Sequence, residues 1–364
     1  LLFVFLSSLS SRLFSWLKKK TQKAIKTDWN LWWTYDGISG PEFWGILNPD
    51  WFLCSKGHRQ SPIDIRPNLL LFDPNLKSLA ITNHSTRITG IIENDGHSVV
   101  FHQNDPQSDH LAANHSEYNQ IEQQQSQSIS TITIKGGPLS YSYVFHKLRI
   151  HFGLTDSSGS EHQLSGFQFP GEIQLIGYNA ELFESYDDAS RKPNGLVGIA
   201  IFLKIDTKSS SAIEIFTSQL NKIRYRGQKA SLKSFSLRDL FPDDQNYLTY
   251  EGSLTTPSCD ESITWIIINK PLSITKNQVF DITVITIAEY ILTVPNQCFE
   301  SSGSIESPKA PLGNNFRSIQ SINDRVIRTN IDFKSNKVSH LNYLPLNLLF
   351  IFHLMSERRK FVQQ

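Results

Sequence analysis

The three cysteines of this chain could bind a metal ion or form a disulfide, and their spacing bears on both possibilities. Cys54, Cys259 and Cys298 form no Cys-x-x-Cys pair, and none stands at ligand spacing from a histidine, so they fit no zinc pattern. Disulfide formation is the other chemistry open to them. A bridge between Cys54 and Cys259 would close a loop of about 200 residues, for which the chain-entropy model gives roughly 5 kcal/mol. The spacing leaves this pairing open, and it leaves Cys298 either free or available to a partner chain.

Two Asn-x-Ser sequons indicate a second modification. They begin at Asn83 and Asn114, both in polar stretches, and would accept N-glycans in a secreted chain. Asn114 lies within residues 103–130, a segment dense in Gln, Ser, Asn and His that carries almost nothing to bury. We expect this segment to be a surface insertion between two strands, and an inert loop rather than a binding element.

The composition describes a globular chain that favours sheet. Of 364 residues, 39% are hydrophobic and 19% are charged, which excludes global disorder. Lys and Arg number 35 against 34 Asp and Glu, which gives a net charge of +1. This charge provides no electrostatic field that would attract nucleic acid or an anionic membrane, so it argues against polyanion binding. Aromatic residues make up 11%, with 7 Trp beside 1 Met, which favours a β-rich domain over a helical bundle.

The elements that must position any site are short strands separated by Gly, Pro, Asn and Ser signals. The expected strands include Ile88 to Ile92, Ser98 to Phe101, Leu148 to Phe152, Glu172 to Tyr178, Val197 to Ile205 and Ile263 to Asn269. Two short helices are expected, over Ser236 to Leu240 with a serine cap and over Thr275 to Thr286. No period of 20 to 50 residues repeats, which argues against propellers and solenoids.

The two ends differ from the body of the chain. Residues 1–28 begin with an apolar run and a Ser-rich stretch, which is typical of a partial secretory signal; a frayed amphipathic leader is the alternative. The tail, residues 334–364, contains the apolar run Leu341 to Met355, which is short for the roughly 20 residues of a membrane span. A removable anchor signal, an interfacial helix and a mistranslated end all remain open for this run, so membrane association stays undecided.

Seven short motifs occur in order within residues 29–333. They are Trp33-Thr34-Tyr35, Gly40-Pro41-Glu42-Phe43-Trp44, Arg59-Gln60-Ser61-Pro62-Ile63-Asp64-Ile65, Gly159-Ser160-Glu161-His162, Asn194-Gly195-Leu196, Gly252-Ser253-Leu254-Thr255-Thr256-Pro257 and Trp265. Together they resemble the α-class carbonic anhydrases. The resemblance implies one mainly β (α+β) domain over 29–333, with a large twisted, mostly antiparallel central sheet, a few short helices and a site in a conical cleft. It also implies a Cys54–Cys259 disulfide, as in the extracellular members of that family.

The resemblance places three zinc-ligand positions at Arg149, His151 and Gln174, which are histidines in active members. Alternation along a strand puts Arg149 and His151 on one face, and Lys147 on that same face adds a further positive charge. A guanidinium stays protonated, and a unit charge roughly 5 Å from a divalent ion at an effective dielectric near 20 is repelled by about 7 kcal/mol. We therefore expect no metal or other cofactor, with His151 a packed, hydrogen-bonded histidine and Arg149 paired with Glu161 or Glu172.

Other parts of the family's site remain in the sequence. His97 matches the proton shuttle, Thr255 the hydroxyl that orients zinc-bound hydroxide, and Glu161 the carboxylate that accepts its proton, so these and Thr256 would be vestigial without metal. The apolar wall of the cleft is matched by four positions. They are Ile176, Leu254 and Trp265, with Gly198 in place of a valine and expected to deepen the wall.

Arginine and glutamine at two ligand positions resemble the carbonic anhydrase-related proteins of the X and XI type. That resemblance implies a catalytically inactive pseudoenzyme that is secreted or held at the cell surface and binds a protein such as a neurexin-like receptor. The alternative is a zinc metalloenzyme with carbonate dehydratase (CO₂ hydration) or residual esterase activity, supported by His97, His151, Glu161, Thr255 and Thr256. A third hypothesis, an adhesive domain tethered by the C-terminal apolar run, differs in location rather than chemistry.

Overall fold

The computed structural model describes residues 33–103, 131–242, 246–284 and 313–333. The predictions for residues 1–28, for the insertion beyond Gln103, for Asn114, for Cys298 and for the tail 334–364 concern residues outside these ranges. In the described ranges, no helix is long and apolar enough to cross a membrane.

Strands make up most of the regular structure. The large sheet contains β2 (Leu70–Phe72), β3 (Leu79–Thr82), β4 (Ile88–Asn94), β5 (Val99–Gln103), β6 (Thr133–Gly136), β7 (Tyr143–Phe152), β10 (Gly171–Asn179), β11 (Leu196–Ile205), β12 (Lys229–Phe235), β13 (Tyr247–Gly252), β14 (Ile263–Ile274) and β15 (Ile327–Thr329). A small sheet contains β1 (Asp64–Ile65), β8 (Gln163–Leu164) and β9 (Phe167–Gln168). The helices are short: α2 (Trp44–Leu47), α3 (Leu53–Lys56), α4 (Tyr186–Ala189), α5 (Ser211–Thr217) and α6 (Lys276–Val284), with 3-10 turns η2 (Gly37–Ser39), η3 (Pro49–Trp51), η4 (Pro67–Leu69), η6 (Leu220–Lys222) and η7 (Leu237–Leu240).

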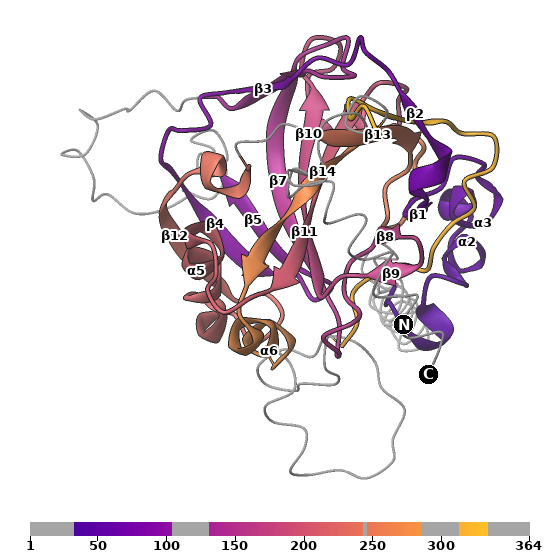
Figure 1. Ribbon diagram of the computed structural model, residues 1–364. Helices are drawn as coiled ribbons and strands as arrows, with labels where there is room; N and C mark the ends of the chain where they lie inside the picture. Colours follow the sequence, from indigo (N-terminus) through magenta and orange to yellow (C-terminus); the bar gives the residue numbers. More distant parts are fainter. Residues whose placement is uncertain (1–32, 104–130, 243–245, 285–312, 334–364) are drawn as a thin grey trace, which may run out of the picture. The chain divides into compact units, whose positions relative to one another are not determined.

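The large sheet is 12-stranded and follows the order β12-β4-β5-β7-β10-β11-β14-β13-β15-β2 (Figure 1). Off this path, β6 pairs with β7, and β3 pairs with β6. Its pairs are antiparallel except for β11 with β14 and β15 with β2. This arrangement confirms the predicted mainly β fold with a mostly antiparallel sheet. The six strands expected from the sequence are all present.

Alternation along the strands divides the core into two apolar clusters, one on each face of the sheet. On β7, Leu148 and Ile150 belong to the first cluster, to which α5 contributes Phe216. On β14, Trp265 and Ile267 belong to the second cluster. Because period-two alternation sends intervening residues to the opposite face, Arg149 and His151 of β7 lie on the side of the second cluster.

The two predicted helical segments are present, with starts one residue later than expected. The first is the 3-10 turn η7, whose preceding Ser236 makes no side-chain cap and instead donates a hydrogen bond to the backbone oxygen of His84 at 2.9 Å. The second is α6, which begins at Lys276 and is described as far as Val284.

A disulfide joins Cys54 and Cys259, with Cα atoms 5.0 Å apart across a sequence separation of 205. The predicted pairing is therefore confirmed. It connects α3, near the start of the described domain, to the loop that follows β13 and carries Thr255 and Thr256.

Candidate functional site

The sheet register brings the three expected ligand positions together. On neighbouring strands β7 and β10, Arg149 is the direct cross-strand partner of Gln174, and His151 is the partner of Glu172. Antiparallel partners share a face of the sheet, so all four side chains project from the same side. The spatial grouping predicted from the sequence is thus present, although its members contact different partners.

His151 is completely buried and hydrogen-bonded on both sides of its ring. Its Nδ1 lies 2.6 Å from the backbone oxygen of Asn315, and its Nε2 lies 3.2 Å from Oε1 of Gln174 and 3.6 Å from Oε2 of Glu161. Nδ1 must donate to the carbonyl oxygen, and Nε2 can bond the amide oxygen only if it also carries a hydrogen. This environment agrees with the predicted hydrogen-bonded histidine, because both ring nitrogens face polar groups of the protein.

Gln174 occupies the space between two buried carboxylates. Its Nε2 donates to Oε2 of Glu161 at 2.8 Å and to Oε1 of Glu172 at 2.9 Å. The two N–H groups of the amide are therefore both used, and its oxygen faces His151. Each polar atom of this side chain has a partner, which is the condition for burying an amide without a large desolvation penalty.

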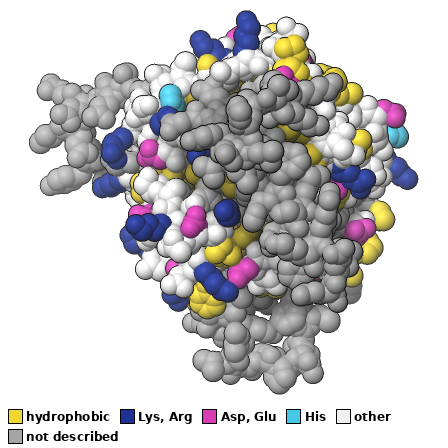
Figure 2. All heavy atoms as spheres, in the orientation of Figure 1, with side chains coloured by type: hydrophobic (Ala, Val, Ile, Leu, Met, Phe, Trp, Pro, Cys, Tyr) yellow, Lys and Arg dark blue, Asp and Glu magenta, His cyan; other side chains and the backbone are white. Residues whose placement is uncertain are grey.

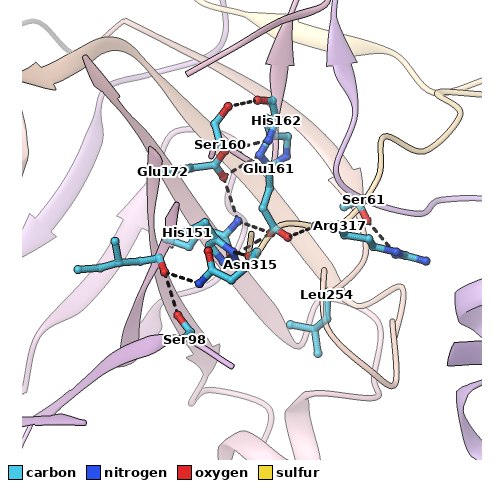
Figure 3. A network of polar contacts seen from close by, with 12 residues as sticks. Ser61, Ser98, His151, Ser160, Glu161, His162, Glu172, Leu254, Asn315 and Arg317 are labelled. Carbon is cyan, nitrogen blue, oxygen red and sulfur yellow. Dashed lines mark hydrogen bonds and ion pairs between the residues drawn. The ribbon is translucent and has the colours of Figure 1, made fainter. Parts of the chain in front are cut away.

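Glu161 and Glu172 belong to a larger buried network, seen in Figure 3. Nδ1 of His162 lies 2.9 Å from Oε1 of Glu172, and Nε2 of His162 lies 2.7 Å from the hydroxyl of Tyr250. Burial raises the pKa of Glu172, but the charge of His162 and hydrogen bonds from His162 and Gln174 outweigh burial and hold the pKa below its usual value. The carboxylate thus stays ionised at neutral pH.

Arg149 does not pair with Glu161 or Glu172, and that prediction was wrong. Its Nη2 donates to Oδ2 of Asp95 at 3.3 Å, with the arginine side chain 17% and the aspartate side chain 26% exposed. Glu161 and Glu172 are already bonded by Gln174 and His162, so the longer guanidinium arm points outward to the turn between β4 and β5. Burial is the largest single effect and lowers the pKa of Arg149, but Asp95, together with Tyr35, Tyr186 and Glu161, raises it more, so the net direction is upward.

Asp95 is held in place by the backbone of its own turn. Its Oδ1 accepts hydrogen bonds from the backbone N–H groups of His97 at 2.8 Å and Ser98 at 2.7 Å, which leaves Oδ2 to face Arg149. Burial raises the pKa of Asp95, while Arg149, His97 and these backbone bonds together lower it below its usual value. The carboxylate therefore remains a fixed negative charge beside the guanidinium.

A β-bulge next to these residues gathers further polar groups. The β7–β10 register shifts between Ile176 and Gly177, so that Lys147 and Phe145 have partners while His146 is the extra residue. His146 stacks on the ring of Tyr186 with centroids 4.1 Å apart, and the Nζ of Lys147 lies 4.4 Å from the centroid of the same ring. Burial and the charge of Arg149 lower the pKa of Lys147 to about 7, and burial and Lys147 lower the pKa of His146 to about 3.

The residues that match the proton-transfer part of the family's site are present but differently connected. His97 is 5% exposed and Thr255 is 3% exposed, so both are buried. The two oxygens of Glu161 accept from Nε2 of Gln174 and from the backbone N–H of Arg317 at 3.0 Å. No hydrogen bond joins Thr255 to Glu161 within the described structure, and Thr256 lies partly exposed in the same loop.

Three of the four residues predicted to form an apolar wall belong to the second core cluster or pack against it. Ile176 and Trp265 are buried there, and Leu254 packs against them. Gly198 does not deepen this wall, contrary to expectation, because a Cβ atom at this position would lie 2.6 Å from the Cζ3 atom of Trp265. The indole occupies the volume that a larger side chain would take.

One of the two predicted glycosylation sites can be placed. Asn83 is exposed in the turn between β3 and β4, where its backbone φ is 57° and its Nδ2 donates to the backbone oxygen of Thr131 at 2.9 Å. Ser85 of the same sequon is also exposed. The position is accessible from solvent, and its glycosylation stays a prediction.

Two residues of the network were not foreseen from the sequence. Asn315 binds both the ring of His151 and the backbone N–H of Phe152, the latter at 2.6 Å through Oδ1. Arg317 is 1% exposed and donates to Gln60, to the backbone oxygen of Ser61 and to that of Cys54. Both lie in an extended segment without regular secondary structure, which offered no periodic signal.

The residues present do not fit a zinc ion. In the described part of the chain, no group of three or more His, Cys, Asp or Glu side chains is arranged to hold a metal. Two of the three ligand positions carry a guanidinium and an amide, and the third position has both ring nitrogens engaged. On the face in Figure 2, the Lys and Arg side chains of the described residues are scattered among Asp and Glu side chains.

Comparison with known proteins extends these observations to the whole domain. The family model described as eukaryotic-type carbonic anhydrase matches residues 39–331. A Caenorhabditis elegans protein named "Putative carbonic anhydrase-like protein 2" is 32% identical over 317 residues, which cover 86% of this chain and 83% of that protein.

Proposed function

This chain belongs to the eukaryotic-type carbonic anhydrase family, and we propose that it is a catalytically inactive member that binds no zinc and acts by binding another protein. The observation that carries this proposal is the replacement of two ligand imidazoles by Arg149 and Gln174, both bonded to groups of the protein itself. The reaction of the family needs a metal-bound hydroxide, which needs neutral imidazole ligands and an open coordination position.

Electrostatics supports the absence of metal. A fixed guanidinium at a ligand position would repel a divalent ion by about 7 kcal/mol at 5 Å and an effective dielectric near 20, an upper figure because Asp95 offsets part of the charge. The amide of Gln174 is a poor zinc ligand beside imidazole, and its two N–H groups already bond Glu161 and Glu172. Metal binding would also require breaking these buried hydrogen bonds.

Zinc content decides between inactivity and the alternative, a zinc enzyme that hydrates CO₂ or hydrolyses esters. Protein purified with its disulfide intact and without added metal is expected to contain far less than one zinc per chain and to hydrate CO₂ at the buffer rate. Stoichiometric zinc together with hydration above that rate would support the enzyme and overturn the proposal. A catalytically active relative prepared in parallel controls for metal loss during purification.

The binding half of the proposal concerns a secreted or cell-surface protein. The Cys54–Cys259 disulfide supports an oxidising compartment, and the exposed sequon at Asn83 is compatible with it. The family resemblance suggests a neurexin-like receptor as partner. Glycosylated, oxidised protein is expected to bind cells that display a neurexin-like ectodomain and not matched cells that lack it; equal binding to both would remove this partner.

A further inference from the structure

Two cationic side chains on one face of β7 share a single nearby carboxylate. Arg149 makes one hydrogen bond within the described residues, to Asp95, and its buried Nε has no partner there. Lys147 has neither a hydrogen bond nor an ion pair with any described residue, and its ammonium instead lies over the ring of Tyr186. A guanidinium carries five N–H donors and an ammonium three, so most of the donor capacity of this pair is unused.

Both side chains are reachable from solvent and fixed in position. Arg149 keeps 17% of its side chain exposed, and Lys147, His146 and Tyr186 are each partly exposed. The bulge in β7 places the stacked rings of His146 and Tyr186 beside the two cations. A ligand would therefore meet donors that need little ordering on binding, which lowers its entropic cost.

Among the described residues, no acidic group forms an ion pair with Lys147, whereas both Asp95 and Glu161 act on Arg149. Asp95, in the β4–β5 turn, neutralises Arg149. On β4, Glu93 is paired with Lys229 at 2.9 Å. On α4, Asp187 is exposed and acts on Lys147 only at a distance, since no ion pair joins them. His102 and His146 add no charge at neutral pH, because burial and Lys147 lower their pKa values.

We propose that Arg149 and Lys147 form a binding site for a monocarboxylate. A carboxylate can accept from the unused N–H groups of the guanidinium and from the ammonium at once, and these charge-assisted bonds are the stronger class of hydrogen bond. A single carboxylate charge suits a site that already faces Asp95 and lies near Glu161, whereas a dianionic phosphate would add a second negative charge there. The inference rests on the proposed function, because it takes the face where the family holds zinc to be free of metal.

A titration with benzoate tests the site, because its ring can lie against His146 and Tyr186 while its carboxylate meets the cations. Full-length oxidised protein is titrated by calorimetry with benzoate and with benzamide, its neutral isostere. An N-acetylated, C-amidated peptide with one Glu is the third probe. Tighter binding of benzoate indicates a free small ligand, and tighter binding of the peptide indicates a carboxylate carried by a partner; either result supports the site.

Three variants make the result attributable to these residues. Lys147→Gln is expected to weaken binding of the better probe about tenfold or more, the range for loss of one charge-assisted bond. D95N/R149Q removes the ion pair as a neutral pair, so it should fold and also weaken binding, whereas Lys270→Gln, an exposed lysine on β14, should leave binding unchanged.

Each contrary outcome has one meaning. Three results would overturn the site. They are the lack of saturable binding of either carboxylate at about 10 mM, benzamide binding as tightly as benzoate, and equal affinity in K147Q and the natural protein. Zinc is measured on the same samples. Metal-free protein that does not bind carboxylates would refute this inference alone. Stoichiometric zinc would refute the proposed function. Benzoate binding that is lost on chelation would then show that benzoate binds the metal.

Discussion

Replacing Arg149 and Gln174 together with histidine is expected to create a zinc site. The two positions are direct cross-strand partners, and His151 lies on the same face two residues along β7. Asn315 already holds Nδ1 of His151, which would leave its Nε2 for the metal once the amide of Gln174 is gone. Glu172, now bonded to Gln174, lies where it can orient a histidine at position 174.

The single substitutions give the magnitude. Q174H alone keeps the guanidinium, whose repulsion of about 7 kcal/mol corresponds to roughly 10⁵-fold weaker zinc binding than in R149H/Q174H. This factor is an upper bound, because Asp95 offsets part of the charge of Arg149. R149H alone restores two imidazoles and is expected to bind zinc with intermediate affinity.

Zinc affinity is measured by competition with a chelator of known strength, on protein whose thermal unfolding shows a single cooperative transition. R149H leaves Asp95 without its partner, so D95N/R149H/Q174H serves as the control for any loss of stability. A folded double variant that binds no zinc would show that the three positions do not converge as described. Equal affinity in Q174H and the double variant would show that the guanidinium does not exclude the metal.

Three further predictions concern stability. In a double-mutant cycle, D95N and R149Q should show a coupling of about 1 to 3 kcal/mol in urea unfolding, and a value near zero would mean an ordinary surface pair. The pKa of Lys147 is lowered to about 7 in the folded state, so the unfolded state binds more protons between pH 7 and its usual 10.5. The free energy of unfolding should therefore rise with pH from 7 to 9, by at most about 1.4 kcal/mol per pH unit, and K147Q should flatten this rise; parallel curves would contradict the lowered pKa. Gly198→Val should lower the free energy of unfolding by about 1 to 3 kcal/mol, because its side chain would meet the ring of Trp265, whereas no loss would mean that the indole moves easily.

The sequence was sufficient where the structure depends on strand periodicity and on ordered motifs. Alternation put Arg149 and His151 on one face, and the motif order placed Gln174 beside them, as the register shows. The Cys54–Cys259 bridge followed from the family resemblance, and not from the cysteine spacing.

The sequence was insufficient where a side chain has several possible hydrogen-bond partners. Arg149 bonds Asp95 because Gln174 and His162 already bond the two carboxylates that were expected to pair with it. Gly198 was expected to leave space, but the orientation of the Trp265 ring, which no local pattern specifies, takes it. Arg317 reaches Glu161 across 156 residues from a segment without periodicity, so only tertiary packing reveals it.

The position of β15 in the sheet has a consequence for synthesis on the ribosome. β15 lies between β13 and β2, and its Ile327 is in register with Leu70, a residue made 257 positions earlier. β2 has no other neighbour in the described sheet, so it stays unpaired in the nascent chain until residues 327–329 leave the exit tunnel. A chain released early would expose the edges of both β2 and β13, which are templates for aggregation. Completion of this fold is therefore a late step that depends on the last described strand.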